Sequence, residues 1–271
     1  MRWVRRAQPT KWFGAPGYHG QISAARTKLA PLVKADQADL VFVDNASAGM
    51  NAVLRSLHWA AGDIVLIFGS VYPVIPNTVA WLARQYRVRA VPVHVGYPIS
   101  GADDYVQPLR AALGNLSATE RKRVRLVCMD HISSYPSVVL PVEQLAAIVK
   151  ADTAWSAPTD DGAEGSSSGG ALVFVDGAHA LGQVHINISR FAAVGVDFYV
   201  MDGHKWFMSP HGSALLWVAK SAQKLLVPDV ISSDNAVGTA FQNQFDYIGK
   251  VPQSMGPRHS CLHPLSSGPP L

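Results

Sequence analysis

Reactive side chains follow apolar segments at several points of this 271-residue chain. In the stretch GHKWF, Lys205 lies between a histidine and a tryptophan, directly after the apolar run VDFYVMD. Asp176 ends another apolar run, ALVFVD, far enough back in the chain for one crossover between neighbouring strands. A lysine that forms a Schiff base and an aspartate that keeps a pyridine nitrogen protonated suit pyridoxal phosphate chemistry. The two residues are therefore candidates for one such site.

Six short apolar runs rich in β-branched residues alternate with segments of helical periodicity. Apolar residues recur at spacings of three and four in residues 49–60, 75–86 and 142–150, as they do in amphipathic helices. Runs that are apolar on both faces predict strands of a mostly parallel sheet with helices on both sides. These strands are expected at residues 40–44, 63–69, 88–95, 124–130, 171–176 and 196–202. We therefore expect a three-layer α/β/α sandwich.

Polar motifs stand at the ends of four of the expected strands. DNASAGMN follows the first strand, MDHISSYP the fourth, DGAHALG the fifth and DGHKW the sixth. In open α/β sheets, ligands bind beyond the carboxyl ends of the strands. A single polar strand end is ordinary, but four of them predict one shared polar pocket.

These motifs resemble those of the class V aminotransferase family, within the fold-type-I pyridoxal-phosphate enzymes and close to the isopenicillin N epimerase-like and cysteine desulfurase-like branch. The matching motifs are NASAGMN, DHISS, VDGAHALG, DFYVMDGHKWF and SPHGSALLWV, in the order of the family and over roughly residues 20–249. GHKW by itself would be weak evidence, whereas the ordered set is strong. The resemblance implies the large domain of that fold and pyridoxal 5'-phosphate as cofactor.

The resemblance implies catalytic roles for three residues. Lys205 corresponds to the Schiff-base lysine. Asp176 corresponds to the aspartate that pairs with the pyridine nitrogen, and its alternative is a helix-capping aspartate. His179 lies near the cofactor face, where it either moves protons or packs.

Further residues are expected to contact the cofactor because of the same resemblance. Ala46 and Ser47 open a helix whose amides and hydroxyl cradle the phosphate, although Ser47 is also a plausible ordinary cap. Tyr72 stacks on the cofactor or plugs a loop. His204 contacts the phosphate or is a satisfied core histidine.

The motif DHISS carries two less certain positions. Ser134 stands where desulfurase-like relatives place an asparagine near the phenolic oxygen of the cofactor, so that contact is expected to be weaker or water-mediated. His131 shares this strand end, and structural and catalytic roles fit it equally.

The resemblance implies an enzyme that acts on an amino acid by C–S lyase, epimerase or aminotransferase-type chemistry. All three reactions begin with removal of the α-proton of the substrate. The chain has no cysteine in an obvious mobile active-site loop, which disfavours a persulfide-forming desulfurase and favours lyase or epimerase-like chemistry. Fold-type-I sites are built from two subunits, so a homodimer is expected for a complete chain.

Composition restricts the other partners. The formal net charge is +4, and the basic cluster RKRVR at residues 121–125 is interpreted as a solvated lead-in to a strand, so no nucleic acid is expected. Cys128 lies in an apolar run and is expected to be buried, and the chain's two cysteines cannot form a zinc site or a disulfide framework. No apolar run is long enough to span a bilayer, so we expect no membrane partner and a cytoplasmic location.

Two regions depart from the expected domain. Residues 153–170, rich in Ser, Gly and Asp, predict a flexible insertion within a large domain that covers residues 1–250. Residues 251–271, rich in Pro, Ser and Gly, predict a disordered tail. The tail cannot be the small C-terminal domain that supplies a substrate-binding arginine in relatives. A truncated, catalytically impaired pyridoxal-phosphate-binding fragment is therefore the alternative to an active enzyme.

Overall fold

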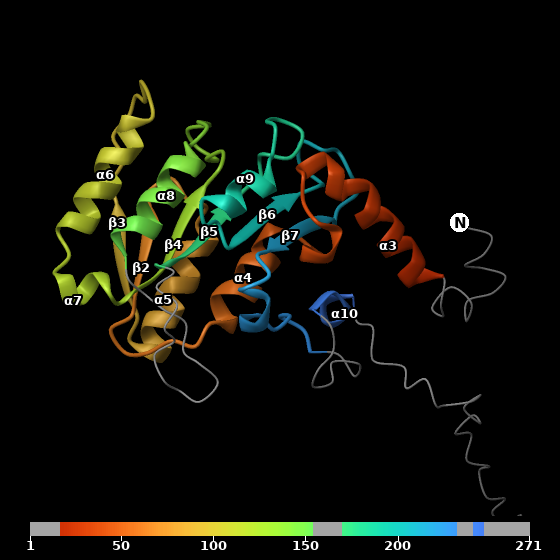
Figure 1. Ribbon diagram of the computed structural model, residues 1–271, viewed down its shortest axis with the longest axis horizontal. Coiled ribbons are helices and arrows are strands. Elements are labelled where there is room, and N and C mark those ends of the chain that lie inside the picture. The colour runs from red at the N-terminus through yellow and green to blue at the C-terminus, as the bar shows by residue number, and fades with distance from the viewer. Residues whose placement is uncertain (1–16, 154–169, 232–240, 247–271) are drawn as a thin grey trace, which may run out of the picture.

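Seven strands form one mixed sheet in a computed structural model that describes residues 17–153, 170–231 and 241–246 (Figure 1). Six strands run in the same direction, whereas β7 is antiparallel to both of its neighbours. The order across the sheet is β1 (Leu40–Val43), β7 (Ala214–Val218), β6 (Phe198–Asp202), β5 (Leu172–Asp176), β4 (Val124–Asp130), β2 (Ile64–Phe68) and β3 (Arg89–Val93).

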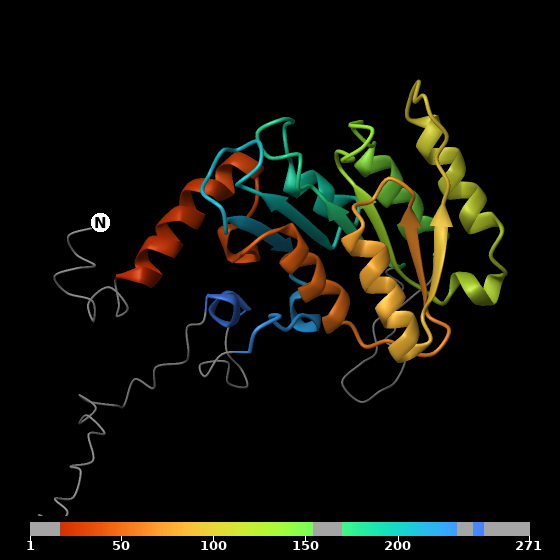
Figure 2. The same cartoon turned by 180° about the vertical axis from the view of Figure 1, so that it is seen from behind.

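Helices cover both faces of the sheet, and Figures 1 and 2 show the three layers from opposite sides. One face carries α4 (Ala46–Ser56) and α5 (Val74–Tyr86), and α4 contacts β6 and β7. The other face carries α6 (Asp103–Gly114), α8 (Val142–Asp152) and α9 (Ile188–Ala193). The remaining helices are α3 (Tyr18–Leu29), α7 (Ala118–Arg121), α10 (Phe241–Phe245) and the 3-10 turns η1 (Ala30–Val33), η2 (Gln37–Asp39) and η3 (Gln223–Leu225).

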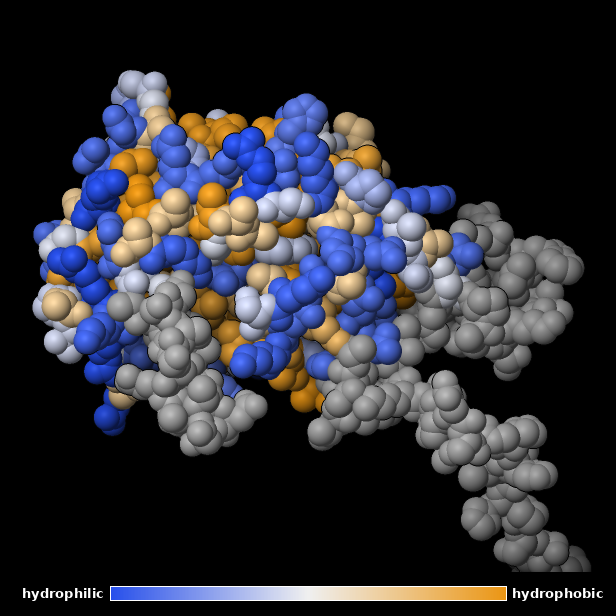
Figure 3. All heavy atoms as spheres, in the orientation of Figure 1, coloured by the Kyte–Doolittle hydropathy of each residue, from blue (hydrophilic) through white to orange (hydrophobic). Residues whose placement is uncertain are grey.

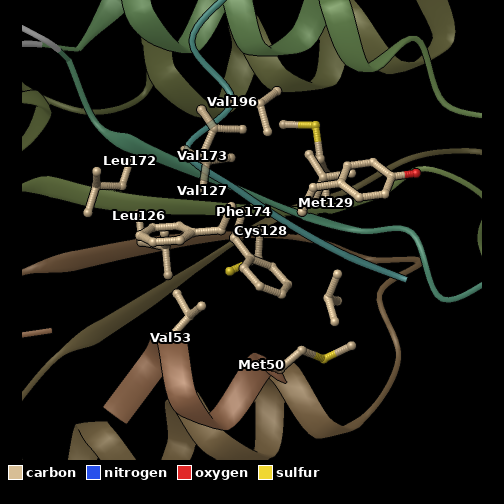
Figure 4. Packing of buried hydrophobic residues seen from close by; sticks show 14 of the residues in the cluster. Met50, Val53, Leu126, Val127, Cys128, Met129, Leu172, Val173, Phe174 and Val196 are labelled. Carbon is tan, nitrogen blue, oxygen red and sulfur yellow. The ribbon is translucent and has the colours of Figure 1, made fainter. Parts of the chain in front are cut away.

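The core lies on both sides of the central strands. All residues of β2, β4, β5, β6 and β7 are buried, which agrees with their largely apolar sequences, although β4 also buries Arg125. In Figure 4, Met50 and Val53 point from α4 toward the strands, and Val173 and Val196 lie on the opposite side of the sheet. This packing fixes the strands rigidly and so fixes the positions of the residues at their ends.

All six strands expected from the sequence are confirmed to within a few residues. Strand β7 and helix α6, which contains Pro108, are additional to the expected elements. The helix expected over 49–60 begins earlier and ends at Ser56, after which the Trp59 indole donates back to the carbonyl of Leu54 at 2.8 Å. The expected insertion and tail lie outside the described residues, apart from the boundary positions 153 and 170.

The basic cluster RKRVR leads into β4 with Lys122 and Arg123 exposed, as expected, but its last residue differs from that interpretation. Arg125 is buried on β4, where its guanidinium lies 3.4 Å from the carboxylate of Asp63 and over the Trp59 ring. A buried arginine paired in this way contributes to packing and is unavailable to a polyanion. Cys128 is fully buried as expected, and burial raises the pKa of its thiol. Among the described residues, no helix is both long and apolar enough to cross a membrane.

Candidate active site

The polar strand ends meet at one edge of the sheet. Strands β1, β2, β4, β5 and β6 all have their carboxyl ends there, and β7 begins there because it runs the opposite way. Asp130 and Asp176 are register partners at the ends of β4 and β5, and Asp202 is the register partner of Ala214. The expected crossover is confirmed, because β5 and β6 are neighbours.

Lys205 lies in the loop that joins β6 to β7. The loop is closed at its base by a hydrogen bond of 2.9 Å from the Gly203 amide to the Ser213 carbonyl. The Lys205 ammonium lies 3.0 Å from a carboxylate oxygen of Asp202 and 5.9 Å from the ring centroid of Tyr72. Its amine is thus held at the sheet edge by one carboxylate and one aromatic face.

Asp202 is a site residue that the sequence analysis did not single out. Its second carboxylate oxygen accepts a hydrogen bond of 2.7 Å from the amide of Ala46, the first residue of α4. The side chain is almost fully buried, with only 4% exposed. One carboxylate therefore joins the lysine to the amino end of α4. The sequence signal was its place as the last residue of the sixth expected strand.

The amino end of α4 offers one group to an anion. The Ala46 amide is already bonded to Asp202, and the Ala48 amide donates to the capping side chain of Asn45 at 2.8 Å. Among the amides of the first helical turn that the structure describes, the Ser47 amide has no recorded acceptor. Ser47 is half-buried, and its side-chain hydroxyl is a second donor at this helix end. Helix dipole and free donors favour a phosphate at such an end, and here they point to Ser47 more than to Ala46.

Asp176 is buried at the end of β5. One of its carboxylate oxygens accepts a hydrogen bond of 2.9 Å from the Ala178 amide. Burial raises the pKa of Asp176 to about 6, although the Ala178 amide and the nearby Lys205 charge act in the opposite direction. A carboxyl group with this pKa is readily ionised by a cationic partner, because the partner's charge offsets the cost of burial.

The turn after Asp176 depends on a glycine. A Cβ on Gly177 would lie 2.4 Å from the ring of Tyr199, which is closer than side-chain atoms approach. Tyr199 in turn bonds to His131, with 2.7 Å between its hydroxyl and the Nδ1 atom. His131 packs edge-on against Phe191, and burial lowers its pKa to about 4. His131 is therefore a neutral residue that supports the turn from behind.

His179 lies between two partners at the same edge. The indole N–H of Trp206 donates to its Nδ1 atom at 3.2 Å, and its Nε2 atom lies 3.1 Å from the hydroxyl of Ser134. Burial and the charge of Lys205 lower the pKa of His179. Trp206 is the second residue that the sequence analysis left without a role, although it stands next to Lys205.

His204 has different partners from His179. Its Nδ1–H donates to the Ser213 carbonyl at 3.0 Å, and its ring lies against that of His211 with 5.2 Å between centroids. Its Nε2 atom is 3.9 Å from Asp202. The expected phosphate contact of His204 stays a prediction, as does the stacking of the half-exposed Tyr72.

A second buried acid stands beside Asp176. Burial, followed by the charge of Asp176, raises the pKa of Asp130 to about 8. Ser70 is near enough to oppose this shift but does not reach hydrogen-bond geometry, so one oxygen of Asp130 has no partner among the described residues. At neutral pH the pair therefore carries its negative charge mainly on Asp176.

The donor set fits pyridoxal phosphate. The site presents an amine for an aldehyde, a buried carboxylate for a protonated ring nitrogen, and a helix amino end with a hydroxyl for a phosphate. A seven-stranded α/β sheet with such groups at the carboxyl ends of its strands is the architecture of the fold-type-I pyridoxal-phosphate proteins.

Comparison with known proteins agrees with this class. The model of the family named aminotransferase class-V matches residues 17–244, and the chain belongs to this family. A protein of Oryza sativa subsp. japonica provisionally named L-cysteine desulfhydrase 2 is 30% identical over 89% of this chain. Isopenicillin N epimerase of Amycolatopsis lactamdurans is 29% identical over 77% of it.

A solved structure has the same fold. The cystine C–S lyase C-DES, in complex with its reaction product cysteine persulfide, superposes with a TM-score of 0.69 at 22% identity. That match covers 91% of this chain and 60% of the lyase. The chain spans 49% of the Oryza relative and 46% of the epimerase, which is about half of their lengths.

Proposed function

We propose that this chain forms the pyridoxal-phosphate-binding domain of an enzyme that cleaves a carbon–sulfur bond of an amino acid. The observation that carries the proposal is the convergence of Lys205 and Asp176 from neighbouring strands onto one sheet edge, where the lysine charge acts on the pKa of the aspartate. The names of the relatives support the substrate class, since they include L-cysteine desulfhydrase and hercynylcysteine sulfoxide lyase.

The side chains have distinct tasks in this proposal. Bound pyridoxal phosphate would supply an electron sink for the charge left when the substrate loses its α-proton. Asp176 would keep a proton on the ring nitrogen of the cofactor, and its buried position would strengthen that charge pair. Lys205 would hold the cofactor through its amine, and its Nζ atom is the group that would accept the α-proton of the substrate.

Asp202 and Ser47 position these groups. Asp202 orients the Lys205 amine at 3.0 Å, and it orients α4 through the Ala46 amide. Ser47 then offers its amide and hydroxyl to the phosphate. His179, whose pKa is lowered by burial, would lie against the cofactor ring while its two ring nitrogens stay bonded to Trp206 and Ser134.

The fate of sulfur separates two kinds of relative. A desulfurase transfers sulfur to a cysteine of its own. Cys128 is fully buried in the sheet, so this cysteine cannot serve as an acceptor, whereas Cys261 lies outside the described residues. We therefore favour release of sulfur to solvent, as in a C–S lyase, over its transfer to the protein. The likeness to isopenicillin N epimerase keeps epimerisation as the second reaction to test.

Cofactor binding is tested by reduction and peptide mapping. The purified chain is incubated with pyridoxal phosphate, reduced with borohydride and digested, and the modified lysine is identified by mass spectrometry. We expect the label on Lys205, and we expect Lys205→Ala to lose it. Lys220→Ala is the matched control, since Lys220 is an exposed lysine that also pairs with an aspartate, Asp36. A label that Lys205→Ala leaves unchanged would overturn the assignment.

The reaction is tested by product analysis on the same preparations. With L-cysteine as substrate, a C–S lyase releases sulfide and pyruvate, whereas an epimerase changes only the configuration of the α-carbon. Sulfide release that depends on Lys205 supports the proposal. A chain that takes up cofactor and turns over none of the sulfur amino acids would instead be the impaired pyridoxal-phosphate-binding fragment.

We also propose a homodimer, formed on the face that carries α4 and α5. An open groove of about 660 Å³ lies there, lined by residues that include Arg55, Tyr72 and Trp81, and Tyr72 also faces Lys205. The exposed hydrophobic residues of this face include Tyr72 and Tyr86, which are 49% and 44% exposed. Figure 3 shows the opposite face, which carries α8 and α9 and where hydrophobic residues lie among hydrophilic ones. Sedimentation of the cofactor-loaded chain tests this proposal, and a saturated monomer would contradict it.

A cytoplasmic location is likewise a proposal. The low cysteine content, with two in 271 residues, supports a reducing compartment. One relative from Arabidopsis thaliana is named as chloroplastic, so fractionation of cells that express the tagged chain is the direct measurement.

A further inference from the structure

Three side chains from three different strand ends form one line of hydrogen bonds. Trp206 follows β6, His179 follows β5 and Ser134 follows β4. The Trp206 indole nitrogen lies 3.2 Å from Nδ1 of His179, and Nε2 of the same ring lies 3.1 Å from the Ser134 hydroxyl. Both ring nitrogens of the histidine are therefore engaged.

The chemistry of the first residue gives this line a direction. An indole nitrogen can only donate, so Nδ1 of His179 must accept and must carry a lone pair. A neutral imidazole with an unprotonated Nδ1 carries its proton on Nε2. His179 consequently donates to the oxygen of Ser134, and the serine hydroxyl proton is left to point elsewhere.

The surroundings keep the ring neutral. His179 is partly buried, and the Lys205 ammonium is near enough to disfavour a second positive charge, which together outweigh the attraction of Asp202. Among the described residues, the Ser134 hydroxyl has no recorded acceptor of its own. A donor without an acceptor at the edge of this site is available to an oxygen anion.

We propose that Trp206 is a positioning residue that fixes His179 in its Nε2–H tautomer and thereby turns the Ser134 hydroxyl into a donor toward an anionic oxygen of the bound cofactor. The tautomer is a property of the protein alone. Only the identity of the oxygen, the phenolic oxygen of pyridoxal phosphate, rests on the proposed function. Because Trp206 is the neighbour of Lys205 in the chain, the loop that supplies the amine also orients the histidine.

The tautomer is measured by ¹⁵N NMR of the histidine side chains in the full chain without cofactor. We expect the shifts of His179 to report an unprotonated Nδ1 and a protonated Nε2. Trp206→Phe removes the N–H donor but keeps an aromatic ring. A hydrogen bond of ordinary strength then predicts a roughly two- to ten-fold gain of the competing Nδ1–H and doubly protonated forms at a given pH.

Trp59→Phe is the matched control, because the Trp59 indole donates to the Leu54 carbonyl and has no recorded contact with His179. This variant should leave the His179 shifts unchanged. An Nδ1–H tautomer in the unmodified chain would overturn the proposal even if Trp206→Phe failed to fold. So would a Trp206→Phe variant whose His179 shifts and titration match those of the control.

The second step is read from the absorption of the chain loaded with pyridoxal phosphate. Loss of a donor to the phenolic oxygen should raise the pH midpoint of the visible band in Ser134→Ala and, to a smaller extent, in Trp206→Phe. If the midpoint of Ser134→Ala does not move, the hydroxyl donates elsewhere and this step is wrong. If the chain takes up no cofactor, the proposed function fails while the tautomer result stands by itself.

Discussion

Replacing Asp130 by asparagine should make the free energy of unfolding less dependent on pH. Asp130 is 2% exposed at the end of β4, next to Asp176, and burial raises its pKa to about 8. In the unfolded chain the same carboxyl titrates near 4. Between these two values the folded state holds a proton that the unfolded state has released, so rising pH favours unfolding.

The magnitude follows from the width of that interval. Each pH unit within it lowers the free energy of unfolding by about 1.4 kcal/mol for this one proton. From pH 5 to pH 8 the free energy of unfolding of Asp130→Asn should therefore rise by about 4 kcal/mol relative to that of the unmodified chain. Above pH 8 this difference should level off. Asp176 titrates in both proteins, so its contribution largely cancels in the difference.

Urea unfolding followed by tryptophan fluorescence at pH 5, 6, 7 and 8 measures this difference. Asp36→Asn serves as the control. Asp36 is an exposed helix cap whose pKa is lowered by the Ala38 amide and then by Lys220. Its carboxylate is therefore ionised in the folded and in the unfolded chain throughout this pH range. If Asp130→Asn and the unmodified chain show parallel pH profiles, Asp130 is not held protonated and the reasoning fails.

Three further perturbations test the site and its support. Asp176→Asn should lower turnover far more than cofactor affinity, because the phosphate cradle remains; parallel losses in spectroscopic titration and kinetics would make Asp176 structural. Gly177→Ala should destabilise the fold by about 1–3 kcal/mol in urea unfolding, since the Cβ meets the Tyr199 ring, and an unchanged midpoint would contradict this. Arg26→Ala should cost about 3–5 kcal/mol by leaving the buried carboxylate of Asp246 without its guanidinium, and a cost below 1 kcal/mol would show that the pair is dispensable.

Four of the six strands that the sequence predicts, β2, β4, β5 and β6, are buried on both faces, whereas the edge strand β3 is largely exposed. The β-branched runs of the four buried strands have no polar alternation, and that pattern arises only where helices cover both sides of a sheet. Strand β7 is just as apolar, but its antiparallel pairing between β1 and β6 depends on which partners the chain meets, and periodicity carries no such information. Helix α6 was missed because Pro108 interrupts its pattern, while neighbouring residues still bury an apolar face.

The candidate site divides in the same way. Lys205 and Asp176 stand out in the sequence because a charged residue at the end of an apolar strand is costly unless it has a task. Asp202 is as buried as Asp176, but its partners, the Ala46 amide and the Lys205 amine, become visible only when β6 and α4 are packed together. Trp206 was taken as part of a motif, because the direction of a hydrogen bond cannot be inferred without its acceptor.

The two bonds of Asp202 have a consequence for how finely the site can be tuned. Pyridoxal phosphate carries its aldehyde and its short phosphate arm on adjacent ring carbons, so the amine and the amino end of α4 would have to stay within the reach that this arm allows. Both are set from the same carboxylate, at 3.0 Å and 2.7 Å. Lengthening that side chain to glutamate would move both attachment points at once by about 1.5 Å. Changes elsewhere in the sheet would shift the two points together and preserve their spacing, which leaves the scaffold free to vary in sequence while the fit to the ligand is kept.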